Sequence, residues 1–257
     1  MKDATYSTCN ATSAPRRSPS PGAARVTGLD LSLKSLEEAR QIAADAEQDV
    51  DYVHANVYDA VDALQGRQFD VVYTGKGALC YLPDLQQWAK VVHELLKPGG
   101  ALYLVEFHPL LTALREVSLP GESDDLTLRA DYLEGRGAIA HDSTVSYTGD
   151  EVPGRQRSYE WHHGLGEIVT SLVGEGLHVT TLRESEVLPW PRWPAMQQTP
   201  EGWWRLPDDA PRIPYCSRSR QPGRRDSPTI SGSRDASRPR SSRCAPVRAG
   251  CVPRTDR

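Results

Sequence analysis

An α/β fold built on a doubly wound, mainly parallel sheet is predicted for this 257-residue chain by two observations. First, short apolar runs that are typical of strands alternate with segments of helical periodicity between residues 25 and 107. Second, the run at 101–107, Ala-Leu-Tyr-Leu-Val-Glu-Phe, is almost continuously apolar, as expected for a central parallel strand that is covered on both faces. Both features favour an α/β domain in the middle of the chain.

The first elements of this domain are a strand at 25–31 and a helix that follows it. Ser32 suits the N-cap of that helix, and small or apolar residues then recur at positions 36, 39, 43 and 46. Strands are expected next at 50–55 and 69–73. A second helix is expected from about 85 to 96, where Lys-Pro-Gly-Gly supplies a cation and helix breakers.

The second half of the domain begins after a polar stretch at about 115–142. Residues 144–147 and 157–161 are expected to form a hairpin, followed by a helix at 164–175 and a strand at 177–184. The run LPWPRWPAMQQTPEGWWRLPDD is rich in Trp and Pro and is expected to be an ordered loop.

The two ends of the chain differ from its middle. Residues 1–24 contain no Val, Leu or Ile, and residues 215–257 are rich in Ser, Arg and Pro, so both are predicted to be disordered around a domain at 25–214. The C-terminal segment holds 11 Arg and 3 Asp, a charge of +8, which leaves −12 for residues 1–214 out of the overall −4. An acidic body gives no electrostatic reason to expect nucleic acid as a partner.

Cysteine spacing and hydropathy exclude several classes of protein. The five cysteines show no CxxC or Cys/His spacing, so neither a metal site nor a disulfide framework is expected. No apolar run reaches membrane-spanning length, and the N-terminus lacks the apolar core of a secretion signal. We therefore expect a cytoplasmic protein that uses no membrane. The sequence does not set its oligomeric state.

Asp30 is the first candidate functional residue, because it ends a predicted strand in Val-Thr-Gly-Leu-Asp-Leu-Ser. Ligands of doubly wound sheets bind outside the carboxyl ends of the strands, where an acid can accept both hydroxyls of an adenosine ribose. Alternatively, Asp30 is an acid that the dipole of the following helix favours. This residue taken alone leaves both interpretations open.

Four blocks of sequence resemble the class I S-adenosylmethionine-dependent methyltransferases, in particular small-molecule-type bacterial members whose substrates are mostly unassigned. The blocks are VTGLDLSLKSLEEAR, VHANVYDA, FDVVYTGKGALCYLPDLQQWAKVVHELLKPGGALYLVEFHP and YEWHHGLGEIVTSLVGEGL, and the resemblance runs from about residue 25 to 214. It implies a Rossmann-like sheet with strand order 3-2-1-4-5-7-6, S-adenosylmethionine as cofactor and a small-molecule acceptor.

The resemblance also implies roles for individual residues. Asp30 accepts the ribose hydroxyls, Asn56 and Val57 lie against the adenine, and Thr74 and Gly75 pass beside the methionine part of the cofactor. The alternative for Asn56 is a turn residue that caps its own backbone. The alternative for Gly75 is a loop hinge.

Methyl transfer needs little acid–base machinery, because the sulfonium is already a good leaving group and positioning supplies most of the catalysis. No catalytic residue is therefore predicted. His108, Trp161 and His163, with His162, are candidates for the substrate side, where a histidine can take a proton from the nucleophile. Packing or capping is the alternative for each histidine. Adjacent residues on a strand point to opposite faces, so His162 and His163 are not predicted to share a metal.

The resemblance requires a first strand and a glycine turn before VTGLDLS, but the chain has TYSTCNATSAPRRSPSPG there. If the codons from Tyr6 onward are read one frame over, they permit Leu-His-Leu-Gln-Cys-His-Ile-Gly-Thr-Glu-Thr-Leu-Ser-Leu-Ala-Arg, an apolar strand followed by a glycine turn. The same offset from Pro214 permits Leu-Leu-Phe-Ser-Leu. We therefore hypothesise that both ends are out of frame, that strands 1 and 7 are missing or corrupted, and that this chain expresses poorly and binds no cofactor.

The sequence leaves two alternatives to methyl transfer. A nicotinamide-dependent oxidoreductase would also use Asp30, but it requires a GxGxxG before that residue, and neither reading frame supplies one. A non-catalytic remnant that binds RNA or an acidic surface through residues 215–257 is the other alternative. Acceptor selectivity is expected to lie in residues 110–161 and 188–206.

Overall fold

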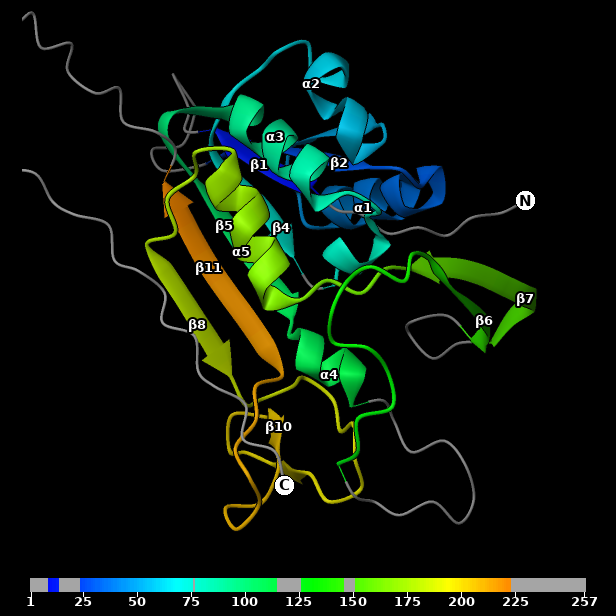
Figure 1. Ribbon diagram of the computed structural model, residues 1–257. Helices are drawn as coiled ribbons and strands as arrows, with labels where there is room; N and C mark the ends of the chain where they lie inside the picture. The colour runs from blue at the N-terminus through cyan, green and yellow to red at the C-terminus, as the bar shows by residue number, and fades with distance from the viewer. Residues whose placement is uncertain (1–8, 14–23, 76, 115–125, 146–150, 223–257) are drawn as a thin grey trace, which may run out of the picture. The chain divides into compact units, whose positions relative to one another are not determined.

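The computed structural model describes residues 9–13, 24–75, 77–114, 126–145 and 151–222 (Figure 1). All of these residues belong to the compact unit Met1–Arg225. The secondary structure is mixed α/β and is built around one large sheet. None of the helices in the described ranges is long and apolar enough to cross a membrane.

The central sheet has seven strands in the order β3-β2-β1-β4-β5-β11-β8 (Figure 1). In that order the strands are β3 (Val50–His54), β2 (Arg25–Asp30), β1 (Cys9–Ser13), β4 (Phe69–Gly75), β5 (Leu96–Phe107), β11 (Cys216–Pro222) and β8 (Thr181–Ser185). The pairs β2/β3 and β4/β5 are parallel, whereas β1 is antiparallel to both of its neighbours. Likewise, β11 is antiparallel to β5 and β8.

Strands occupy the two positions where strands 1 and 7 were expected to be missing or corrupted, so these strands are not missing, although β1 is antiparallel to both of its neighbours. Cys9–Ser13 lies between β2 and β4, and Cys216–Pro222 lies between β5 and β8, although both segments were predicted to be disordered. The physical reason is that backbone N–H and C=O groups on strand edges must find partners, and a segment poor in apolar side chains supplies them as well as an apolar one. The rest of the two predicted disordered ends, residues 1–8, 14–23 and 223–257, lies outside the described residues.

The direction of β1 follows from the length of the chain that connects it to β2. A parallel crossover needs a dozen or more residues, usually a helix, and only residues 14–24 separate the two strands. As a consequence, β1 begins where the parallel strands end, with Cys9 opposite Leu29 of β2 and Thr74 of β4. The central strand therefore presents its first residue, not a following glycine turn, at the carboxyl edge of the sheet.

The predicted helices form, and two of them have side-chain N-caps, of which Ser32 was predicted and Asp84 was not. Helix α1 (Leu33–Asp45) begins at Ser32, whose Oγ accepts a hydrogen bond of 3.2 Å from the N–H of Ser35. Helix α3 (Leu85–Leu95) begins at Asp84, whose Oδ1 accepts one of 2.8 Å from Gln87. The remaining helices are α2 (Ala60–Ala63), α4 (Pro109–Ala113) and α5 (Leu165–Gly174), with 3-10 turns η1 (Val57–Asp59) and η2 (Leu79–Tyr81).

Lys-Pro-Gly-Gly follows α3 as predicted, but these four residues are part of β5, which starts at Leu96. Gly99 has φ +76°, a conformation that favours glycine. A Cβ on Gly100 would lie 2.9–3.1 Å from the carbonyl oxygens of Lys97, Phe69 and Asp70. Gly100 is therefore required by the close approach of β5 to the start of β4.

The main core lies between the sheet and the helices α3 and α5, which are in front of it in Figure 1. Trp88 of α3, Leu172 of α5, Val72 of β4 and Leu102 of β5 are all completely buried there. On the opposite face of the sheet, α1 contacts β2 and β3.

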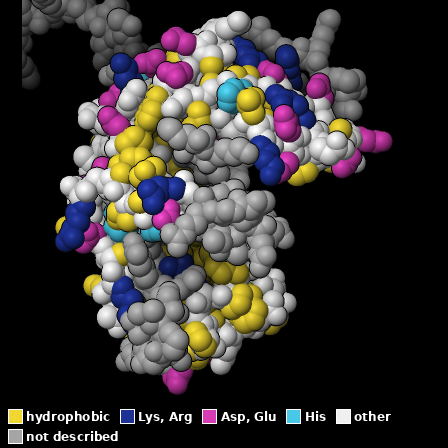
Figure 2. All heavy atoms as spheres, turned by 90° about the vertical axis from the view of Figure 1, so that its right-hand side faces the viewer, with side chains coloured by type: hydrophobic (Ala, Val, Ile, Leu, Met, Phe, Trp, Pro, Cys, Tyr) yellow, Lys and Arg dark blue, Asp and Glu magenta, His cyan; other side chains and the backbone are white. Residues whose placement is uncertain are grey.

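The carboxyl edge beyond β5 is covered by α4 and by the Trp/Pro-rich run. This run is ordered as predicted, and it contains a short pair of strands, β9 (Gln197–Gln198) and β10 (Trp204–Arg205). Its buried side chains form a second core cluster with α4, made of Leu111, Leu114, Leu188, Trp193, Met196, Leu206 and Tyr215. A hairpin forms in this region, as β6 (Ile139–Val145) and β7 (Glu151–Glu160), but residues 157–160 pair with 139–142 and not with the expected strand at 144–147, of which 146–147 lie outside the described residues. Acidic and basic side chains are interspersed on the face in Figure 2.

Candidate functional site at the carboxyl edge of the sheet

The structure gathers the five residues predicted to bind a cofactor at one edge of the sheet. Strands β2, β3 and β4 all end there: Asp30 is the last residue of β2, Asn56 and Val57 follow β3, and Thr74 and Gly75 end β4. In the doubly wound architecture this edge is where ligands bind.

Asp30 is fixed by backbone hydrogen bonds. Its Oδ1 accepts a bond of 2.7 Å from the N–H of Ser32, and its carbonyl oxygen accepts one of 3.1 Å from Ala55, after β3. Its side chain is only 3% exposed, and this burial raises its pKa, while the hydrogen bond from Ser32 and the nearby His54 act in the opposite direction. Because a carboxylate has about four acceptor positions, Asp30 retains capacity for ligand hydroxyls beyond its contact at the start of α1.

Asn56 and Val57 both direct their side chains to the protein. The Oδ1 of Asn56 accepts a 3.0 Å hydrogen bond from Tyr58 and caps η1, the turn role that was the alternative interpretation. The Val57 side chain is 2% exposed and belongs to the main core cluster. A ligand at this point would therefore meet mainly the backbone of these two residues.

Of the two residues that end β4, Thr74 has a feature that suits a bound ligand, whereas Gly75 is required by close packing of the protein itself. The Oγ1 of Thr74 is buried and finds no hydrogen-bond partner within the described residues, which is costly unless a ligand supplies one. A Cβ on Gly75 would lie 2.5 Å from the Tyr73 hydroxyl and 2.9 Å from the Val105 carbonyl oxygen, so no larger residue fits. These residues fit an adenosine-containing cofactor, with a carboxylate for hydroxyls and an unpartnered hydroxyl nearby.

Glu106, which was not predicted as a site residue, is a buried acid that contacts the residues following β4. It lies near the end of β5, is 4% exposed, and accepts hydrogen bonds from the N–H groups of Gly77 (2.9 Å) and Ala78 (3.0 Å). Burial raises its pKa from 4.5 to about 7, although these backbone bonds act to lower it. An acid inside an apolar strand was the available signal in the sequence.

His108 is engaged by the protein on both ring nitrogens. Its Nδ1 accepts a 3.1 Å hydrogen bond from Leu110 at the start of α4, and its Nε2 lies 2.7 Å from Oε1 of Glu184 on β8. Burial lowers its pKa, and the Glu184 carboxylate acts in the opposite direction. This geometry matches the capping alternative.

Trp161 and His163 line one cavity of about 340 Å³, which His108 does not line. The N–H of Trp161 donates a 2.7 Å hydrogen bond to Cys80 in η2, the turn that follows the β4 loop. The His163 ring is held between the Leu82 carbonyl oxygen and the Glu167 carboxylate, each at 2.8 Å. The other lining residues are Pro83, Leu133, Glu134, Gly135, Arg136, Gly137, Ile139, His162 and Glu167.

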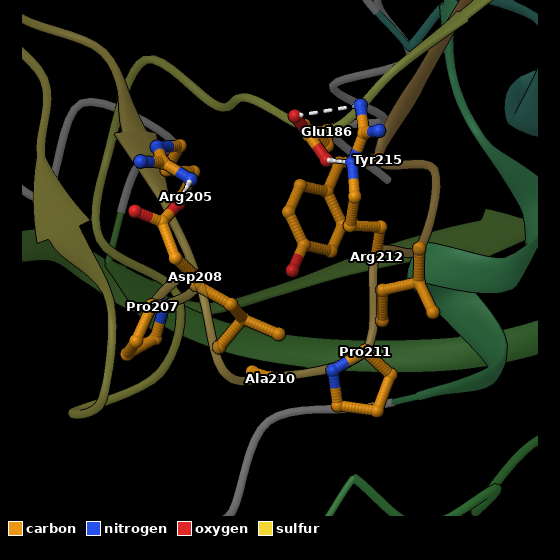
Figure 3. Close-up of a pocket in the computed structure, with 10 residues that line it drawn as sticks. Glu186, Arg205, Pro207, Asp208, Ala210, Pro211, Arg212 and Tyr215 are labelled. Atoms are coloured by element: carbon orange, nitrogen blue, oxygen red, sulfur yellow. Dashed lines mark hydrogen bonds and ion pairs between the residues drawn. The ribbon is translucent and has the colours of Figure 1, made fainter.

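A second cavity, of about 260 Å³, is lined by the end of the Trp/Pro-rich run and by the residues that follow it (Figure 3). Its charged lining residues are paired with one another: Arg212 bonds Glu186 at 2.5 and 3.0 Å, and Arg205 pairs with Asp208. Burial raises the pKa of Tyr215 in its wall to about 12. These charges balance each other, so the cavity presents little to select a charged ligand. Within the described residues, no group of three His, Cys, Asp or Glu side chains is arranged to hold a metal ion.

Comparison with known proteins agrees with this fold. Residues 10–102 match the model of a methyltransferase domain. The chain is 36% identical over 80 residues to the ubiquinone biosynthesis O-methyltransferase of Erwinia tasmaniensis, and 39% over 80 residues to that of Pectobacterium atrosepticum. Each match covers 31% of this chain and 32% of the relative, so the chain spans about a third of the length of the curated relatives it matches.

Among solved structures, an S-adenosylmethionine-dependent methyltransferase from Listeria monocytogenes superposes with a TM-score of 0.53 at 20% identity. This similarity covers 78% of this chain and 80% of that one. The protein therefore has a Rossmann-like fold of the kind found in S-adenosylmethionine-dependent methyltransferases. The chain thus combines a match to a methyltransferase domain at residues 10–102 with the fold of S-adenosylmethionine-dependent methyltransferases.

Proposed function

We propose that this protein binds S-adenosylmethionine at the carboxyl edge of its sheet and transfers the methyl group to a small-molecule acceptor. The observation that carries this proposal is Asp30, a buried carboxylate at the end of β2, in a chain whose residues 10–102 match a methyltransferase domain. The two relatives reported above are named for O-methylation in ubiquinone biosynthesis, which supports a small acceptor.

In this proposal the cofactor supplies a methyl group on a sulfonium, and the protein supplies position. Asp30 accepts the ribose hydroxyls, the backbone at Asn56 and Val57 lines the adenine, and Thr74 and Gly75 lie beside the methionine part. Because the Asp30 side chain is 3% exposed, neighbouring segments separate when the ribose enters. Orientation of the acceptor then provides most of the rate.

We place the acceptor in the cavity that Trp161 and His163 line. Support comes from the backbone bond of Trp161 to η2, which joins this cavity to the turn after the β4 loop. His163 is held on both nitrogens, so we assign it to shaping the cavity and not to proton transfer. His108, which is buried and caps α4, shapes the edge beyond β5.

We further propose that only the adenosine half of the cofactor site is complete, because β1 is antiparallel. The described strand β1 presents Cys9 at the carboxyl edge, opposite Leu29 and Thr74, and the sequence before Cys9 contains no glycine. In this proposal the affinity for S-adenosylmethionine is lowered but binding is retained, which replaces the expectation that the chain binds no cofactor, and the two ends remain hypothesised to be out of frame. Resequencing the gene across residues 1–30 and 205–230 tests it: one-base changes that restore the shifted reading support the hypothesis, and an unchanged sequence refutes it.

The experiment that tests the cofactor assignment is calorimetric titration of the full chain with S-adenosylmethionine. Asp30→Asn should weaken binding by roughly 10- to 100-fold, because hydrogen bonds to a charged acceptor are worth about 1.5–3 kcal/mol. The matched control is Asp51→Asn. Asp51 lies on β3 and forms an exposed ion pair with Arg67, so the same chemical change there should leave binding unchanged. Equal affinities for the Asp30→Asn variant and the unmodified chain would refute the assignment.

A further inference from the structure

The carboxylate of Glu106, on β5, binds Gly77 and Ala78. These two residues follow β4, whose end forms part of the proposed cofactor site. Oε2 accepts from the Gly77 N–H and Oε1 from the Ala78 N–H, so both oxygens hold one short piece of backbone. Hydrogen bonds to an ionised acceptor are stronger than neutral ones. The segment is therefore fixed against β5 by an acid that lies 28 and 29 residues away in sequence.

The burial of this acid has a cost that packing alone does not explain. An unpaired buried carboxylate is unfavourable, and an apolar residue of similar size would fill the same place in the core without that cost. The ionisable groups that face Glu106 are the Tyr73 hydroxyl of β4, the Cys80 thiol of η2 and the Cys216 thiol of β11. None of these three is a cation, so backbone N–H groups stabilise the ionised form.

The segment that Glu106 holds is constrained on its other sides as well. Gly77 has φ +88°, and a Cβ there would lie 3.1 Å from the Phe107 ring. The Cys80 Sγ contacts the Gly77 carbonyl oxygen at 3.3 Å, and the Cys80 carbonyl oxygen accepts from Trp161. A shift of Gly77 and Ala78 would thus be transmitted both to Gly75 and to the wall of the proposed acceptor cavity.

We propose that Glu106 is a positioning residue of the methyltransferase site: its ionised carboxylate fixes Gly77 and Ala78, and thereby sets the affinity for S-adenosylmethionine. This inference rests on the proposed function. Protonation replaces one accepting oxygen by a hydroxyl that faces an N–H, and one of the two bonds is lost. Cofactor affinity therefore increases as the pH rises through about 7.

The first test needs neither cofactor nor variant. The ¹⁵N-labelled full chain is followed by NMR from pH 5 to 9, and the Gly77 and Ala78 amide resonances are expected to shift together with a midpoint near 7. In Glu106→Gln these shifts with pH should disappear. Amides that do not titrate near this pH in the unmodified chain would overturn the proposal, even if the variant failed to fold.

The second test links the carboxylate to the cofactor. We expect the dissociation constant for S-adenosylmethionine to fall about tenfold between pH 6 and pH 8.5 in the unmodified chain and in the Asp51→Asn control, and to stay constant in Glu106→Gln. An affinity of the unmodified chain that does not change with pH, while its two amides titrate, would refute the positioning role. If S-adenosylmethionine does not bind at any pH, the proposed function fails, and titration of the amides still decides whether Glu106 fixes the segment.

Discussion

The pH dependence of folding stability is the sharpest consequence of the buried acid on β5. The pKa of Glu106 rises from 4.5 to about 7 on folding because its carboxylate is buried. At about 1.4 kcal/mol per pKa unit, ionised Glu106 opposes folding by roughly 3 kcal/mol. Below pH 4.5 the group is protonated in both states and this cost is absent. As the pH rises towards 7, the unfolded chain releases a proton that the folded chain retains, and stability falls.

The perturbation that isolates this effect is Glu106→Gln, measured by urea unfolding at several values between pH 5 and pH 8.5. Other titrating groups, such as Asp30 and His108, contribute equally to both proteins, so the difference in unfolding free energy reports Glu106. We expect the variant to gain roughly 2 kcal/mol relative to the unmodified chain across this range. Two stability profiles that run parallel from pH 5 to pH 8.5 would refute the reasoning.

Two further predictions concern the fold that supports the site. Gly100→Ala places a Cβ 2.9–3.1 Å from three backbone oxygens, so thermal unfolding should show a loss of about 1–3 kcal/mol; a melting temperature equal to that of the unmodified chain would contradict the close approach of β5 to β4. Leu172→Ala opens a cavity in the main core and should cost about 2–5 kcal/mol in urea unfolding. Its neighbour Val173 is half exposed, so Val173→Ala should cost less than about 1 kcal/mol, and similar losses in the two variants would refute the assigned burial of α5.

The parts of the fold that the sequence predicts are those with local signals. Ser32 and Asp84 cap their helices through side chains only three residues from the N–H groups they bind, so a short window of sequence contains the whole interaction. The apolar runs of β2, β4 and β5 likewise predict buried strands without information from the rest of the chain. The position of Asp30 follows from one such run, because its place at the end of a strand determines the edge at which it lies.

The parts that the sequence does not predict depend on partners far along the chain. Strands β1 and β11 form from segments poor in apolar residues, because their backbones complete the hydrogen bonding of strands that are already apolar on their own. The roles of Glu106 and His108 depend on Gly77 and on Glu184, which no periodicity connects to them. The direction of β1 depends on the short connection to β2, a constraint that only becomes visible once β1 is known to be a strand.

The most direct test of the central claim, that the carboxyl edge binds the adenosine half of S-adenosylmethionine, is a comparison of three ligands on the full chain by calorimetry. S-adenosylmethionine and methylthioadenosine, which lacks the amino-acid part, are expected to bind with affinities within about tenfold of each other, since removing one or two hydrogen bonds changes binding by about that factor. NAD also carries an adenosine, but the chain lacks the GxGxxG that would hold its pyrophosphate, so NAD is expected to bind more weakly than either of these ligands. Tighter binding of NAD than of either adenosine ligand, or no binding of all three, would contradict the account.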